Sequence, residues 1–184
     1  MKTSDNIELP DGSGASVDAS AGAEDNLEPA GVFKFECYDA DGNLKWTEEV
    51  PNTVVNEGKD YILGAALSGA AQVTTHYNGL IEGSSPTIAA SDTLSSKAWT
   101  ENQDYDEASR VTWSEGGASS QSIDNSGSPS SFTMNASVTI GGAFLASDNT
   151  KGGTTGTLIA AATFSTARSV ASGDTINVTY TINA

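Results

Sequence analysis

Cysteine, histidine and basic residues are scarce in this chain of 184 residues, which has one Cys, one His and eight Lys and Arg. A single cysteine, Cys37, excludes a disulfide within the chain, and we expect it to be a buried strand residue rather than a reactive thiol. One Cys and one His cannot supply the several ligands of a structural zinc site. No apolar run approaches the length of a membrane span, and the N-terminus does not lead into the apolar segment of a secretory signal.

Acidic residues outnumber basic ones by 24 to 8, which gives the chain a formal net charge of −16. The few basic residues are scattered along the chain and form no basic cluster. A surface with this charge repels nucleic acids and anionic membranes. The composition therefore predicts a protein that has neither nucleic acid nor a membrane as its partner.

Almost perfect alternation of apolar and polar residues marks the C-terminal half of the chain. Three runs, 132–140, 158–164 and 176–182, place apolar side chains at every second position, with mostly Thr, Ser, Asn and Ala between them. A period of two is typical of strands that have one buried and one wet face, as in antiparallel sheets. Turn-forming residues at 141–142, 151–153 and 172–174 are expected to separate these strands. The predicted core comprises Phe132, Val138, Leu158, Phe164, Ile176, Val178 and Tyr180.

The remaining chain predicts more strands and a single helix. Strands are expected at 32–38 and 44–50, at 74–81, near 97–101 and 108–115, and at 121–124. The segment 87–97 is expected to be a loop. The residues Asp39 to Asn43 resemble a calcium loop only superficially, because Gly42 is out of place for an EF-hand, and a tight hairpin turn is favoured.

Helical spacing occurs once, where Ile62 is followed by Ala66 and Leu63 by Leu67. Asn56 is the expected N-cap and Gly69 can end the segment, so we predict a helix over 57–68 that lies against the sheet or closes one end of it. Together these patterns predict a mainly β protein: an antiparallel β-sandwich or jelly roll with one short helix.

The N-terminal residues 1–29 differ from the rest, with seven acids, one Lys and no aromatic residue. Such a segment has too little apolar surface to offset its ordering entropy, so we expect an extended acidic arm that orders only against other chains. The predicted organisation is an arm at 1–29 and a β-sandwich domain at 30–184.

Residues with catalytic potential are few. His76 would have to serve any Ser-His-Asp triad, yet it lies in an ordinary strand pattern with no nucleophile elbow nearby. The acids Glu101, Asp104, Asp106 and Glu107 could supply the carboxylate pair of a glycosidase or bind a divalent cation weakly. Acids spaced in this way in a polar segment are more typical of a solvated loop. We therefore predict no catalytic, cofactor or metal site.

Aromatic residues could form a sugar-binding platform, although they more often belong to a core or a subunit contact. The candidates are Trp46, Trp99, Trp113, Tyr77 and Tyr105. Three classes of function remain open on the residues alone: a structural protein, a binding module such as a carbohydrate-binding domain, and, last, an enzyme.

Six segments carry a resemblance to a known group of proteins. These are residues 35–46 (FECYDADGNLKW), 52–58 (NTVVNEG), 79–81, 89–94 (AASDTL), 141–148 (GGAFLASD) and 172–180 (SGDTINVTY). In them the chain resembles small β-rich structural proteins of tailed bacteriophages, over about residues 31–183 and without the acidic arm.

The resemblance implies a non-enzymatic virion protein, first of all a capsid decoration (cement) protein. Such a protein is made in the host cytoplasm, binds the major capsid protein on the outer shell and forms a homotrimer by analogy. It also leaves open a tail or fibre component with a receptor-binding or carbohydrate-binding β-domain. No cofactor is implied.

Overall fold

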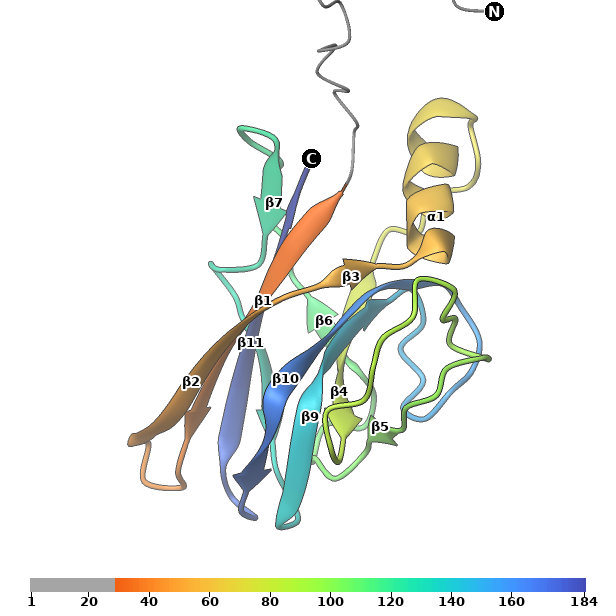
Figure 1. Ribbon diagram of the computed structural model, residues 1–184. Coiled ribbons are helices and arrows are strands. Elements are labelled where there is room, and N and C mark those ends of the chain that lie inside the picture. The colour runs from red at the N-terminus through yellow and green to blue at the C-terminus, as the bar shows by residue number, and fades with distance from the viewer. Residues whose placement is uncertain (1–28) are drawn as a thin grey trace, which may run out of the picture.

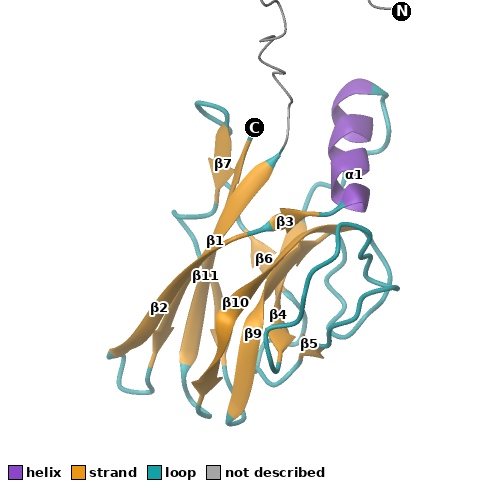
Figure 2. Ribbon diagram, in the orientation of Figure 1, coloured by secondary structure: helices purple, strands orange, loops and turns teal. Residues whose placement is uncertain are grey.

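The structure is a computed structural model, and it describes residues 29–184. The predicted arm at 1–29 lies outside the described residues except for Pro29. Within them the chain is mainly β, with eleven strands and one helix (Figures 1 and 2). The elements are β1 (Ala30–Tyr38), β2 (Leu44–Pro51), β3 (Thr53–Val54), α1 (Asn56–Leu67), β4 (His76–Glu82), β5 (Glu101–Asn102), β6 (Val111–Trp113), β7 (Ser122–Asp124), β8 (Ser130–Thr133), β9 (Val138–Ala146), β10 (Leu158–Val170) and β11 (Thr175–Asn183).

The strands form two antiparallel sheets. Sheet A has the order β2-β1-β11, and both β7 and β8 pair with the far edge of β11. Sheet B has the order β3-β10-β9-β4, and both β5 and β6 pair with the far edge of β4. In sheet A the first strand pairs with the last over its whole length, from Ala30 opposite Asn183 to Tyr38 opposite Thr175.

The main core lies between the two sheets, which pack face to face as a β-sandwich. Sheet A supplies the buried faces of β1, β8 and β11, and sheet B those of β4, β9 and β10. Phe35 of β1 meets Phe164 of β10 edge to face, with ring centroids 4.6 Å apart. Alternation on β1 and β11 follows the predicted period of two, so the sequence-based prediction of an antiparallel β-sandwich with one helix is confirmed.

A second core covers the opposite face of sheet B. Phe144, Leu158 and Ala161 turn their side chains to this face, and the segment 83–100 brings Leu94 and Trp99 onto them. This segment contains no helix or strand, so the predicted loop at 87–97 is confirmed. Because both faces of sheet B are covered, consecutive residues of β9 and β10 are buried and these strands do not alternate.

The run 132–140 is not one strand, contrary to the alternation. β8 belongs to sheet A and β9 to sheet B, so the chain crosses between the sheets within this run. The predicted turn at 141–142 is also wrong, because both glycines lie inside β9. A Cβ on Gly142 would lie 2.0 Å from the carbonyl oxygen of Ala162, so this glycine allows the neighbouring strand to approach.

Six of the seven predicted core residues are buried, and Val138 is the exception. Val138 is only half-buried at the start of β9, where it packs against the margin of the main core. The short strands were predicted too long. The expected strand at 97–101 overlaps β5 only at Glu101, and that at 108–115 shrinks to β6, since most of this stretch is loop.

The helix α1 begins one residue before the predicted start and ends one residue before the predicted end. Asn56 is not its N-cap: Val55 occupies that position and offers no side-chain hydrogen bond. Gly69 follows the helix with a φ of +70°, as expected of a glycine after a helix C-terminus. No helix in residues 29–184 is long and apolar enough to cross a lipid bilayer.

Candidate functional site

The four acids that the sequence singles out do not face one another across a cleft. Glu101 is buried in β5, whereas Asp106 is exposed in the loop that follows. The Glu107 carboxylate accepts the backbone N–H of Thr133 at 3.2 Å, which ties this loop to β8. The prediction of a solvated loop is wrong for Glu101, which is buried, whereas Asp106 is exposed as expected.

Glu101 forms a buried ion pair with Arg110. The guanidinium donates from Nε to Oε1 at 2.9 Å and from Nη2 to Oε2 at 2.7 Å, and Arg110 is only 1% exposed. Arg110 also donates to the backbone oxygens of Asp148 at 2.8 Å and of Gly153 at 2.7 Å. We call Glu101, Arg110 and these two carbonyl groups the arginine clamp. The clamp fixes the chain between β5 and β6 against the loop between β9 and β10.

Lys151 reinforces the same junction. Its Nζ donates to the backbone oxygen of Tyr105 at 2.7 Å and lies 3.7 Å from the centre of the Tyr105 ring. Burial lowers the pKa of Lys151 from its ordinary value. Burial also raises the pKa of the Tyr105 hydroxyl, so this group stays protonated. The arrangement holds two loops together and exposes no reactive group.

His76 lies in β4 between two rings. Its imidazole is edge to face with Tyr61 of α1, at 5.7 Å between centroids, and with Trp113 of β6, at 6.3 Å. Burial lowers the pKa of His76, against a smaller opposing effect of Glu115. A neutral imidazole in an aromatic row anchors α1 to the sandwich, and it has no Ser–His–Asp geometry.

The turn at Asp39 to Asn43 is the predicted hairpin. The Asp39 carboxylate accepts the backbone N–H groups of Asp41 at 3.0 Å and of Asn43 at 2.8 Å, and Gly42 has a φ of +83°. These hydrogen bonds, that from Asn43 first, lower the pKa of Asp39. The carboxylate is thereby committed to closing the turn.

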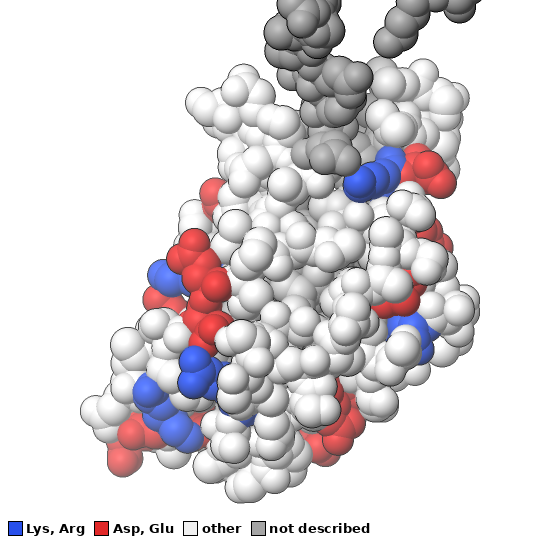
Figure 3. Space-filling view, in the orientation of Figure 1, with Lys and Arg blue, Asp and Glu red and all other residues white. Residues whose placement is uncertain are grey.

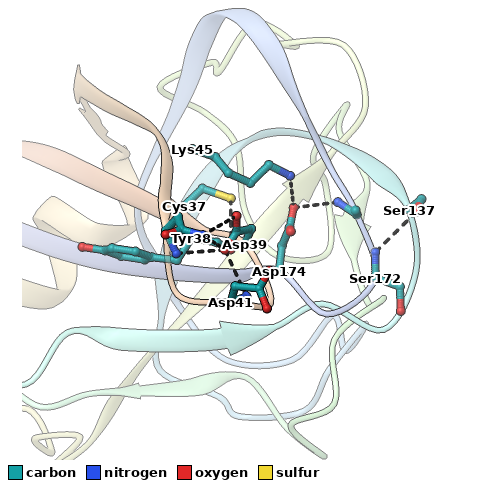
Figure 4. A network of polar contacts seen from close by, with 10 residues as sticks. Cys37, Tyr38, Asp39, Asp41, Lys45, Ser137, Ser172 and Asp174 are labelled. Carbon is teal, nitrogen blue, oxygen red and sulfur yellow. Dashed lines mark hydrogen bonds and ion pairs between the residues drawn. The ribbon is translucent and has the colours of Figure 1, made fainter.

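Beside this turn lies the ion pair of Lys45 and the buried Asp174 (Figure 4). The Asp174 carboxylate also accepts the backbone N–H of Ala171 at 2.8 Å. Cys37 is buried on the sandwich side of this pair, and burial raises the pKa of its thiol to about 11, with a smaller contribution from Asp174. Cys37 is therefore a protonated core residue. Within residues 29–184, no group of three His, Cys, Asp or Glu side chains could hold a metal ion.

Four of the five aromatic candidates, all except Tyr77, lie in or pack against the two cores. Trp99, Tyr105 and Trp113 are buried, and Trp46 and Tyr77 are half-buried. Trp113 donates from its indole N–H to the backbone oxygen of Tyr180 at 3.1 Å, across the two sheets. Trp99, Tyr105 and Trp113 are therefore core residues whose rings are closed to a sugar.

Sequence reasoning missed the main exposed feature, which is the C-terminal half of α1. In residues 29–184 the exposed large hydrophobic side chains are Leu44, Leu63 and Leu67, and the last two lie on this half of the helix. The signal was available, because no Asp, Glu, Lys or Arg occurs between Asp60 and Glu82. In Figure 3 this part of the helix is white, while charged side chains gather over β2.

Comparison with known protein families finds none that matches the chain, and comparison with curated proteins finds no match either.

Proposed function

We propose that this protein is a non-enzymatic structural protein of a tailed-bacteriophage virion, a decoration protein that binds the outer capsid surface and stabilises the shell. The observation that carries the proposal is the arginine clamp. Glu101 and Arg110, which could otherwise serve catalysis, instead hold two loops together. A protein whose role is to stabilise a shell needs rigid connections of this kind. The partners are the major capsid protein and further copies of this chain, as a homotrimer.

Charge supports an outward position. A net charge of −16 disfavours contact with packaged DNA and is compatible with the outside of a shell. On the outer face of sheet A, Glu36 and Glu49 border a shallow hollow together with Lys34, which pairs with Glu36 at 2.9 Å. The outer face of sheet A is therefore expected to remain in contact with solvent and to repel other acidic surfaces.

Cross-links between distant segments support a stabilising role. Besides the clamp, Arg168 of β10 pairs with Glu48 of β2, which joins the margins of the two sheets. Lys45 and Asp174 join the start of β2 to the start of β11. A domain held together by several such ion pairs can transmit force between the capsid subunits that it bridges.

The acidic N-terminal segment supplies the attachment in this proposal. Deleting residues 1–29 keeps every described strand, because β1 begins at Ala30. We expect the truncated protein to melt at nearly the same temperature as the full chain and to bind capsids more weakly. The measurement is co-sedimentation of both forms with undecorated capsids of the parent phage, beside light scattering for oligomer mass.

A full-length variant with the order of residues 2–28 scrambled is the matched control, since it keeps the charge and length of the segment. Loss of binding in this variant as well as in the deletion shows that the sequence of the segment, not its charge, is recognised. Equal capsid binding by full-length and truncated forms would remove the segment from the attachment. If no form binds capsids, decoration is excluded and a tail or fibre component becomes the better proposal.

A further inference from the structure

The exposed half of α1 presents one continuous apolar surface. Leu63 and Leu67 are four residues apart, as are Ala66 and Ala70, and Leu63, Ala66 and Leu67 share one side of the helix. Leu63 is 47% exposed and Leu67 is 81% exposed, and Ala66 and Ala70 are also exposed. We call these four residues the apolar flank. Figure 1 shows this part of α1 standing away from sheet B, at the end of the molecule where β1 begins.

The two halves of α1 are held very differently. In the first half, the Glu57 carboxylate accepts the backbone N–H of Leu158 at 2.9 Å, and Gly58 lies directly against the backbone of Ile159. Tyr61 then contacts His76, and its hydroxyl accepts the N–H of Val73 at 3.0 Å. The only buried residue of the whole helix is Gly58.

The second half needs packing that the described sandwich does not give it. A helix of 12 residues is marginal in water on its own, and most helical stability in proteins comes from burying an apolar face. α1 lacks a side-chain N-cap and has no basic residue in its last turn, so neither end of the helix makes up for the missing burial. An apolar partner against the flank would supply the missing burial.

We infer that the apolar flank is where copies of this protein pack against one another, helix against helix. The charge distribution selects this occupant. Two copies that each have a net charge of −16 repel one another where acidic faces meet. The stretch from Tyr61 to Ile81 has no charged residue, so contact there adds nothing to this repulsion. A basic partner would find no acidic group to bind on this stretch, whereas each further copy brings the same uncharged, apolar surface to the contact.

Small residues make close helix packing possible. Gly64, Ala65 and Ala66 interrupt the leucines, and a Cβ on Gly64 would meet only Ala70 and Ser68, both from its own chain and no closer than 3.5 Å. A symmetric contact here would place the N-terminal ends of the described chains together, because β1 begins at the same end of the molecule as α1 (Figure 1). This inference rests on the proposed function only in that it names the contact by which that protein self-associates.

The test is the mass of the full-length protein in solution, measured by sedimentation equilibrium over a wide concentration range. Leu67→Asp places a charge in the contact, and we expect association at least about tenfold weaker than in the unchanged protein. Leu44→Asp is the matched control, because Leu44 is 54% exposed on β2, away from α1. Leu44→Asp should associate like the unchanged protein, and added salt should strengthen association in both, because it screens the repulsion between copies.

Hydrogen exchange gives a second readout. In the dissociated Leu67→Asp protein the backbone amides of residues 63–68 should exchange faster, while those of β1 and β11 stay protected. An unchanged protein that remains monomeric at every concentration overturns the inference. So does a Leu67→Asp protein that associates as well as the Leu44→Asp control.

Capsid co-sedimentation separates this inference from the proposed function. If Leu67→Asp keeps its oligomer mass but no longer binds capsids, the flank faces the shell, and the inference fails while the proposed function stands. If Leu67→Asp dissociates the oligomer and even the unchanged protein does not bind capsids, the self-association contact stands and the decoration proposal fails.

Discussion

Two segments of this molecule reverse the usual relation between regular structure and burial. The segment 83–100 has no helix or strand, yet it buries Leu94 and Trp99 on sheet B. The helix α1 is regular throughout, yet Leu67 is 81% exposed. The backbone of the loop is ordered by specific contacts, such as the Asp92 carboxylate that accepts the Trp99 indole N–H at 3.2 Å. Stability should therefore follow burial and not regularity, and substitutions in the two segments can test this.

The largest effect is expected at the arginine clamp, next to the end of the loop. Arg110→Ala leaves Glu101 buried without its partner, which should lower the free energy of unfolding by about 3–5 kcal/mol. Arg168→Ala is the control, because the Arg168 side chain is 41% exposed and its pair with Glu48 should contribute less than about 1 kcal/mol. Urea denaturation of both variants gives the two values. Equal losses of unfolding free energy in the two variants would mean that burial of the Glu101–Arg110 pair does not increase its contribution to stability.

Substitutions of Leu94 and Leu67 test the comparison between the buried loop and the exposed half of α1. Leu94→Ala should cost about 2–5 kcal/mol, because it opens a cavity in the second core. Leu67→Ala in α1 should change the stability of the dissociated protein by less than about 0.5 kcal/mol. Thermal unfolding at low protein concentration measures both. A loop variant as stable as the helix variant would show that the segment 83–100 covers sheet B only loosely.

Two glycines test how α1 is attached. Gly58→Ala should cost about 1–3 kcal/mol, because its Cβ would lie 2.2 Å from the carbonyl oxygen of Ile159 and force the helix off β10. Gly64→Ala meets nothing closer than 3.5 Å and should stabilise the helix by about 0.5–1 kcal/mol. Opposite signs of the two changes in denaturation experiments are the expected result. A loss at both positions would contradict the free second half of α1.

The smallest effect is a pH dependence of the helix anchor. Burial lowers the pKa of His76, so below its ordinary value of 6.5 the unfolded chain binds a proton that the folded protein resists. Stability from this group is complete above that value and is lost as the pH falls toward the lowered pKa. We expect the free energy of unfolding to fall between about pH 7 and pH 5.5, and to fall less in His76→Gln. An identical slope in both proteins would assign the dependence to carboxylates instead.

The sequence predicted the sandwich and the helix because both rest on local periodicity. Strands with one solvent-facing side, such as β1 and β11, can be recognised from the alternation of apolar and polar residues. The break between β8 and β9 could not be foreseen, because alternation continues across the crossing from one sheet to the other. The clamp was equally hidden, since two of the four groups in it are the backbone carbonyl groups of Asp148 and Gly153, which any residue carries.

The pairing of β1 with β11 also governs how the domain can form. The register from Ala30 opposite Asn183 to Tyr38 opposite Thr175 joins residues that are far apart along the chain. During synthesis β1 has only β2 beside it until the last strand has left the ribosome. Closing so long a loop before it gains contacts makes folding slow, and the exposed edge of β1 stays open to pairing with other chains meanwhile. Sheet A therefore cannot close until residues 175–183 have been synthesised.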